Sequence, residues 1–190
     1  MTQGRARGLL IGATLLASWL GMQLVHEMGH VLGAWLTGGQ VERVVFHPLT
    51  ISRTDLAHNP NPLVVVWAGP IMGVLIPLAL WGLMAALRLR GSFLARFFAG
   101  FCLVANGLYI GVGAFGPIGD AGDMLAAGSA PWHLWLFGMA TVPLGFWLWH
   151  GQGPRFGLGP RPEAIAPGPV WTATALALTL VAVGLLMGGH

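Results

Sequence analysis

The chain has 190 residues, of which 55% are hydrophobic and only 8% are charged, and its formal net charge is +3. Soluble domains carry about 25% charged residues, so this composition excludes an ordinary soluble globular protein and a disordered chain. Cys102 is the only cysteine, which excludes an internal disulfide scaffold. Length and composition therefore predict a single integral membrane domain over residues 1–190.

The first apolar segment extends from about Gly8 to Leu36, which is longer than the ~20 residues that cross a hydrocarbon layer. It continues through a polar cluster at 26–30 without a small-residue cleavage site, so we expect a retained helix and not a signal peptide. Glycines four residues apart allow close approach of helices. Two such pairs lie in this segment, Gly8/Gly12 and Gly29/Gly33.

Good strand-forming residues follow between Gln40 and Pro62, and His47-Pro48 divides them into two short pieces. This pattern predicts a short, membrane-associated β-hairpin after the first helix. Gly151–Pro169 is rich in glycine and proline and predicts a flexible loop. The remaining predicted spans are 63–87, 97–114, 132–150 and 170–187. The expected fold is an all-α polytopic membrane protein with about five transmembrane helices.

His26-Glu27-Met28-Gly29-His30 has the pattern H-E-x-x-H. On a helix, side chains four residues apart lie on one face, so both imidazoles can bind one zinc ion, while Glu27 can reach a metal-bound water. Ionisable groups inside a membrane span are costly and usually functional. The alternative is that these polar residues lie by chance in the wet interface at the end of the helix.

A catalytic zinc usually has three protein ligands and one open position. Asp120 and Asp123 follow the third predicted span, three residues apart, and share one face if the segment is helical. Either can supply the third ligand, although aspartate is also a common helix cap. Asn106 lies inside the third span, where it can hydrogen-bond substrate or the zinc site, or join two helices.

Other intramembrane chemistries find no support in the sequence. It contains no G-x-S-x-G, and no predicted span pairs a central serine with a histidine. Asp120 and Asp123 are local neighbours, whereas an aspartyl mechanism needs two aspartates on different helices.

The chain resembles the site-2 protease family of intramembrane zinc metalloproteases over about residues 20–126. Three features carry the resemblance: the HEMGH element, Ala68-Gly69-Pro70 at the start of the next span, and Asn106 followed by Asp120-Ala121-Gly122-Asp123. Two features depart from the family. Gly73 stands where an asparagine often follows A-G-P, and Asn106 and Asp120 are fourteen residues apart, a wider spacing than usual.

The resemblance implies one zinc ion held by His26, His30 and a distant aspartate, for which Asp120 aligns best and Asp123 is the alternative. From its polar position inside a span, Asn106 is a candidate substrate-binding residue. The resemblance also implies that an edge of the segment Gln40–Asp55 captures an unwound substrate by main-chain hydrogen bonds.

These observations predict a zinc metalloendopeptidase that hydrolyses peptide bonds of transmembrane or membrane-associated proteins, with a zinc-bound water activated by Glu27. The alternative is a non-proteolytic membrane protein whose zinc is structural or regulatory and which acts as a partner-binding subunit. Glu27 favours the enzyme, because a structural site needs no base. The expected surroundings are the lipid bilayer of a bacterial-type cytoplasmic membrane.

The basic residues are nine arginines that stand beside apolar segments without forming one cluster, so no nucleic-acid partner is expected. In a five-span arrangement with a cytoplasmic N-terminus, seven of them lie inside and two, Arg43 and Arg53, lie outside, as the positive-inside rule prefers. The family resemblance implies the opposite orientation. The inside set is Arg5, Arg7, Arg88, Arg90, Arg96, Arg155 and Arg161.

Overall fold

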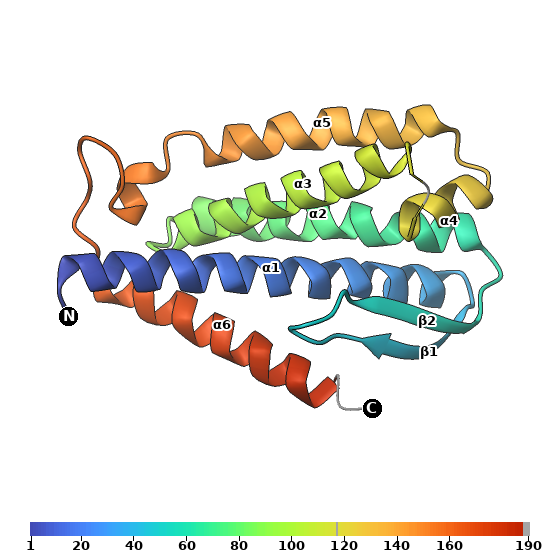
Figure 1. Ribbon diagram of the computed structural model, residues 1–190, viewed down its shortest axis with the longest axis horizontal. Helices are drawn as coiled ribbons and strands as arrows, with labels where there is room; N and C mark the ends of the chain where they lie inside the picture. Colours follow the sequence, from blue (N-terminus) through green and yellow to red (C-terminus); the bar gives the residue numbers. More distant parts are fainter. Residues whose placement is uncertain (117, 188–190) are drawn as a thin grey trace.

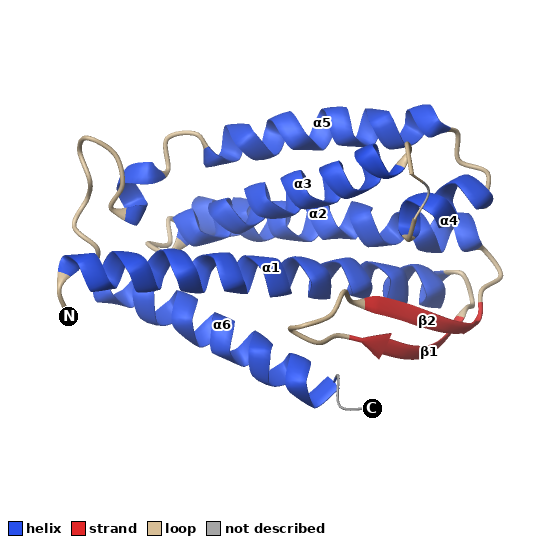
Figure 2. Cartoon of the chain, viewed as in Figure 1, coloured by secondary structure: helices blue, strands red, loops and turns tan. Residues whose placement is uncertain are grey.

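The computed structural model describes residues 1–116 and 118–187, and these residues form a helical bundle with one β-hairpin (Figures 1 and 2). Its helices are α1 (Gln3–Leu36), α2 (Pro62–Ala86), α3 (Ser92–Gly113), α4 (Asp120–Ala126), α5 (Pro131–Trp149), the 3₁₀ helix η1 (Gly153–Phe156) and α6 (Pro167–Met187). The strands are β1 (Gln40–Val45) and β2 (Arg53–His58), both in the segment predicted as a hairpin. The predicted all-α fold with a hairpin after the first helix is confirmed.

Four described helices are long and apolar enough to cross a membrane: α1, α2, α3 and α6. The other predicted span, 132–150, forms α5, which is not among those four. Four tryptophans, two prolines and His133 make α5 less apolar. Nevertheless, α5 packs along α3 between opposite ends of the bundle (Figure 1), so a crossing by α5 remains our expectation.

Small residues bring α3 and α5 together. A Cβ atom added to Gly111 would lie 3.2 Å from the Cα atom of Gly138, and one added to Gly145 would lie 2.8 Å from the carbonyl oxygen of Gly100. Membrane helices pack closely where side chains are small, because no hydrophobic effect drives them together in lipid. The contact holds α3, which carries Asn106, in a defined place.

The segment 151–169, expected to be a flexible loop, contains η1. Phe156 of η1 is buried, and its ring packs against Phe93 and Phe97 at the start of α3, with ring centroids 5.3 Å away in each case. The aromatic contacts of Phe156 hold η1 against α3, within a segment whose glycine and proline content predicts a flexible loop.

The hairpin is antiparallel, with Val44 opposite Thr54 and Val45 opposite Arg53. Phe46 is fully buried, and a Cβ atom added to Gly184 of α6 would lie 3.4 Å from its ring. Leu49 and Ile51 at the tip are exposed, which favours a membrane-associated hairpin. The hairpin and α4 lie at one end of the bundle, and the N-terminus lies at the other (Figure 1).

Candidate metal centre

The two histidines of H-E-x-x-H lie on one face of α1, as the spacing predicts, and both are buried. Close packing of α1 on α2 places them. A Cβ atom added to Gly29 would overlap the carbonyl oxygen of Ala68, and one added to Gly69 would overlap the ring of His30. The A-G-P element is therefore a small-residue surface that makes room for His30.

Of the two glycine pairs in the first helix, only one is a contact site. A Cβ atom added to Gly33 would lie 2.7 Å from the Cβ atom of Ala68, whereas Gly8 and Gly12 have nothing within 4 Å. Gly29 and Gly33 thus allow α1 to pack closely on α2, whereas Gly8 and Gly12 contact no described residue in this way.

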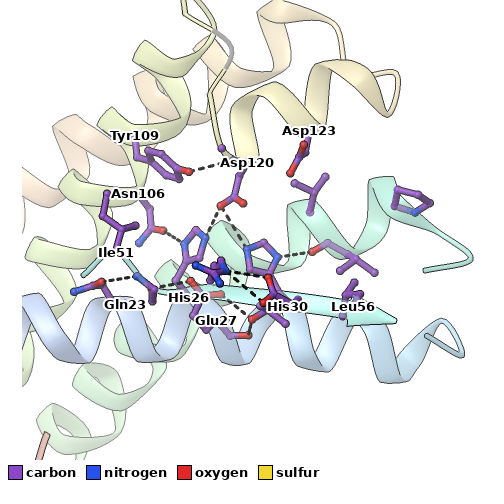
Figure 3. Close-up of a pocket in the computed structure, with 18 of the residues that line it drawn as sticks. Gln23, His26, Glu27, His30, Ile51, Leu56, Asn106, Tyr109, Asp120 and Asp123 are labelled. Carbon is purple, nitrogen blue, oxygen red and sulfur yellow. Dashed lines mark hydrogen bonds and ion pairs between the residues drawn. The ribbon is translucent and has the colours of Figure 1, made fainter. Parts of the chain in front are cut away.

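Asp120 reaches the histidines from the start of α4, after the turn that follows α3 (Figure 3). Its Oδ2 lies 2.7 Å from Nε2 of His26 and 3.4 Å from Nε2 of His30. Gly119 precedes it with φ +59°, a conformation that favours glycine. The Asp120 N–H donates to the hydroxyl oxygen of Tyr109 at 3.1 Å, which fixes the start of α4.

His26, His30 and Asp120 each offer a potential ligand atom, and these atoms lie within 4.8 Å of one another. Nδ1 of His26 lies 2.6 Å from Oδ1 of Asn106, and Nδ1 of His30 lies 2.9 Å from the carbonyl oxygen of Val65. Both oxygens are acceptors, so Nδ1 carries the proton in each ring and Nε2 is left as the ligand atom. Two imidazole nitrogens and one carboxylate oxygen are a suitable donor set for zinc.

Asp123, the alternative third ligand, lines the same cavity, but among the described residues no hydrogen bond or ion pair joins it to either histidine. Its side chain is separate from the Asp120 carboxylate in Figure 3. The structure thus brings Asp120, and not Asp123, to the histidine pair.

Asn106 is buried, and both ends of its amide have protein partners. Its oxygen accepts from His26, and its nitrogen donates to the carbonyl oxygen of Cys102 at 2.9 Å. A Cβ atom added to Gly73 would lie 3.0 Å from Oδ1 of Asn106, so the absence of a side chain at position 73 gives this amide its space. These contacts favour a role in orienting His26 over the predicted contact with substrate.

Burial opposes ionisation of Asp120, but in the metal-free site the adjacent imidazoles of His26 and His30, which donate from Nε2 when that nitrogen is protonated, outweigh it and hold the pKa of the Asp120 carboxyl well below its usual range. Asp120 is therefore a carboxylate, the form in which it can bind a cation. A bound cation would take the place of those Nε2 protons.

Glu27 lies beside this group but is not part of it, and its carboxylate is buried under the hairpin. Ser52 and Thr54 donate hydrogen bonds to its two oxygens. Sequence reasoning missed both hydroxyl residues, and also Gln23 and Tyr109, because no spacing rule connects a residue of α1 with one 25 or more positions later.

A cavity of about 970 Å³ opens onto these side chains, a size typical of ligand sites. The segment Ile51–Leu56 borders it on one side and the start of α2 on another. Apolar side chains make up much of its wall, including Trp19, Met22, Val65 and Val66. The site therefore combines an apolar recess with one buried cluster of ionisable groups.

The family model described as Peptidase M50B-like matches residues 9–110, more than half of the chain. The matched region contains the H-E-x-x-H element, A-G-P and Asn106, and it ends before Asp120, which only the fold connects to the histidines. No match was found among curated proteins or among solved structures. Together with four apolar membrane-length helices, the match indicates an integral membrane protein of a metalloprotease family. The chain belongs to the Peptidase M50B-like family.

Proposed function

We propose that this protein is an intramembrane zinc metalloendopeptidase that holds one zinc ion through His26, His30 and Asp120. The observation that carries the proposal is the convergence of their three ligand atoms within 4.8 Å, with Glu27 adjacent and outside the group. Three protein ligands plus a neighbouring base match a catalytic site, which keeps one coordination position open. The family match supports the same activity from independent information.

A zinc ion in this site would supply Lewis-acid chemistry, polarising a substrate carbonyl and lowering the pKa of a water. Glu27 is the general base: its carboxylate takes a proton from the attacking water and passes it to the departing amine nitrogen. Asn106 and the Val65 carbonyl hold the two imidazoles in the tautomer that presents Nε2.

The substrate class we propose is a transmembrane or membrane-associated protein with an extended stretch near the cleavage site. Among the described residues β2 pairs with β1 along one edge only, and the segment Ser52–Leu56 borders the cavity. An unpaired edge can bind an extended peptide by main-chain hydrogen bonds. A bacterial-type cytoplasmic membrane is the proposed location.

A structural or regulatory zinc site in a non-proteolytic subunit is the competing function. A structural site closes its fourth position with a protein ligand and has no use for a base. Among the described residues, the group of potential ligands holds three members. A group of three potential ligands, with Glu27 next to it in the sequence, favours a catalytic zinc site over a structural one.

The test uses four variants purified in detergent, each assayed for bound zinc and for cleavage of single-span peptides with a central helix-breaking pair. His26→Ala and Asp120→Asn should lose zinc, whereas Asp123→Asn, the matched control, should keep both zinc and activity. Glu27→Gln should keep zinc and lose roughly 10²–10⁴-fold in rate. Normal turnover by Glu27→Gln would rule out the protease. Loss of zinc and folding in Glu27→Gln would support the structural site.

A further inference from the structure

The Glu27 carboxylate is held by two hydroxyl groups of the hairpin. Ser52 Oγ donates to Oε1 at 2.7 Å, and Thr54 Oγ1 donates to Oε2 at 2.7 Å. Both distances are typical of strong O–H···O bonds to a charged acceptor. Each carboxylate oxygen therefore has one protein donor and keeps a further lone pair for another partner.

Local geometry explains why both hydroxyls reach the same side chain. Ser52 and Thr54 are two residues apart in extended chain, so their side chains point the same way. Gln23 lies one helical turn before Glu27 on α1, and its Oε1 accepts the backbone N–H of Ser52 at 3.0 Å. The segment 52–54 is thus docked on one face of α1 by hydrogen bonds from three donors: the Ser52 N–H and the two hydroxyls.

This arrangement bears on catalysis because a glutamate has three rotatable side-chain bonds. A general base must lie within hydrogen-bond reach of the proton that it removes, and a misplacement of about 1 Å can cost about 10²-fold in rate. α1 fixes only the Cα atom of Glu27. The two hydroxyls fix the plane and direction of its carboxylate.

We infer that Ser52 and Thr54 are positioning residues for Glu27, which makes the hairpin part of the catalytic machinery and not only a place for substrate to bind. This inference rests on the proposed protease function. The residues that hold the base also border the cavity. A peptide bound along β2 therefore lies on the segment that sets the direction of Glu27.

The kinetic test compares zinc-loaded wild type with Ser52→Ala, Thr54→Val and the double variant, using the same single-span peptides. We expect kcat to fall about tenfold in each single variant and about 10²-fold in the double, with KM and zinc content nearly unchanged. Thr54→Ser and Ser52→Thr keep a hydroxyl and should restore most of kcat. Thr50→Val is the matched control, because Thr50 is an exposed hairpin residue whose hydroxyl makes no hydrogen bond among the described residues.

A second readout needs no activity: hydrogen–deuterium exchange of residues 50–58 in zinc-free protein. Glu27→Ala and the double hydroxyl variant should speed exchange equally, and combining all three changes should add little. A rise in KM at constant kcat, or additive exchange effects, would overturn the inference while leaving the protease intact. Activity in Glu27→Gln would instead remove the proposed function itself, so the two failures are distinguishable.

Discussion

The two ends of the bundle differ in whether they bury charged residues. The end with the N-terminus carries the arginines predicted to lie inside, and its ion pair between Arg155 and Glu163, at 3.3 Å, is exposed. The other end carries the hairpin and α4, where His26, Glu27 and His30 are at most 7% exposed and the histidines and Glu27 all have hydrogen-bond partners. Exposed charges orient a membrane protein at little cost, whereas buried ones must be paired and positioned.

Substitutions in the closely packed metal centre should therefore have larger effects than substitutions of exposed charged residues. The strongest test of this difference is Gly69→Ala. The new Cβ would overlap the ring of His30, so the imidazole must turn away and zinc binding should be lost. Gly82→Ala, on the same helix, would bring its Cβ atom within 4 Å of no described residue, so it should keep zinc and gain up to about 1 kcal/mol of stability. Mass spectrometry of bound zinc and thermal unfolding in detergent measure both, and a Gly69→Ala protein with full zinc would contradict the packing argument.

The charge difference between the ends also predicts orientation. The arginine-rich end should face the cytoplasm, by the positive-inside rule. In a Cys102→Ala background, a membrane-impermeant maleimide added to intact cells should label Glu42→Cys, in β1, and spare Ala164→Cys, in the loop before α6. The reverse labelling pattern would show that the orientation implied by the family resemblance is correct.

A smaller effect is expected for Gly73→Ala. Its Cβ would lie 3.0 Å from Oδ1 of Asn106, so the amide must shift by a few tenths of an ångström and loosen its contact with His26. Mutation of residues that hydrogen-bond metal ligands typically lowers metal affinity by about 10–100-fold. Because Gly73→Ala moves the Asn106 amide without removing it, we expect the zinc affinity to fall by about tenfold. Titration with a zinc indicator checks this value, and unchanged affinity would show that Asn106 does not orient His26.

The smallest effect is expected on the exposed side of the hairpin. A hydrogen bond from Arg43, with a second from Arg53, lowers the pKa of Asp55 despite a small opposing effect of burial. A pKa that is lower in the folded protein stabilises the fold at pH values above the unfolded-state pKa of about 3.9. This stabilisation is lost as the pH falls through the folded-state pKa. Because the pair is exposed, Asp55→Asn should cost no more than about 1 kcal/mol at pH 7, and the difference should shrink as the pH falls below the unfolded-state pKa. A cost of several kcal/mol would mean that the hairpin depends on this ion pair.

The long apolar helices and the histidine pair were predictable because each follows from a local pattern. A run of apolar residues predicts a span whatever lies beside it, and His26 and His30 share a helix face by spacing alone. The α5 helix was also predicted, as the span 132–150, although its tryptophans and prolines weaken the apolar signal. Packing on α3 adds to its order in the structure. The order within 151–169 was missed, because it depends on contacts of Phe156 with α3.

The sequence by itself determined the class of protein, the H-E-x-x-H face and a short set of candidate third ligands, since composition and helical periodicity are properties of neighbouring residues. The family resemblance already favoured Asp120 over Asp123, and the tertiary structure brings Asp120 to the histidines. Only the tertiary structure places Asn106 against His26, and Ser52 and Thr54 against Glu27. Those contacts depend on where α3 ends, how Gly119 turns the chain, and how the hairpin folds back on α1. They join side chains 25 to 94 positions apart, and no local rule carries information over that distance.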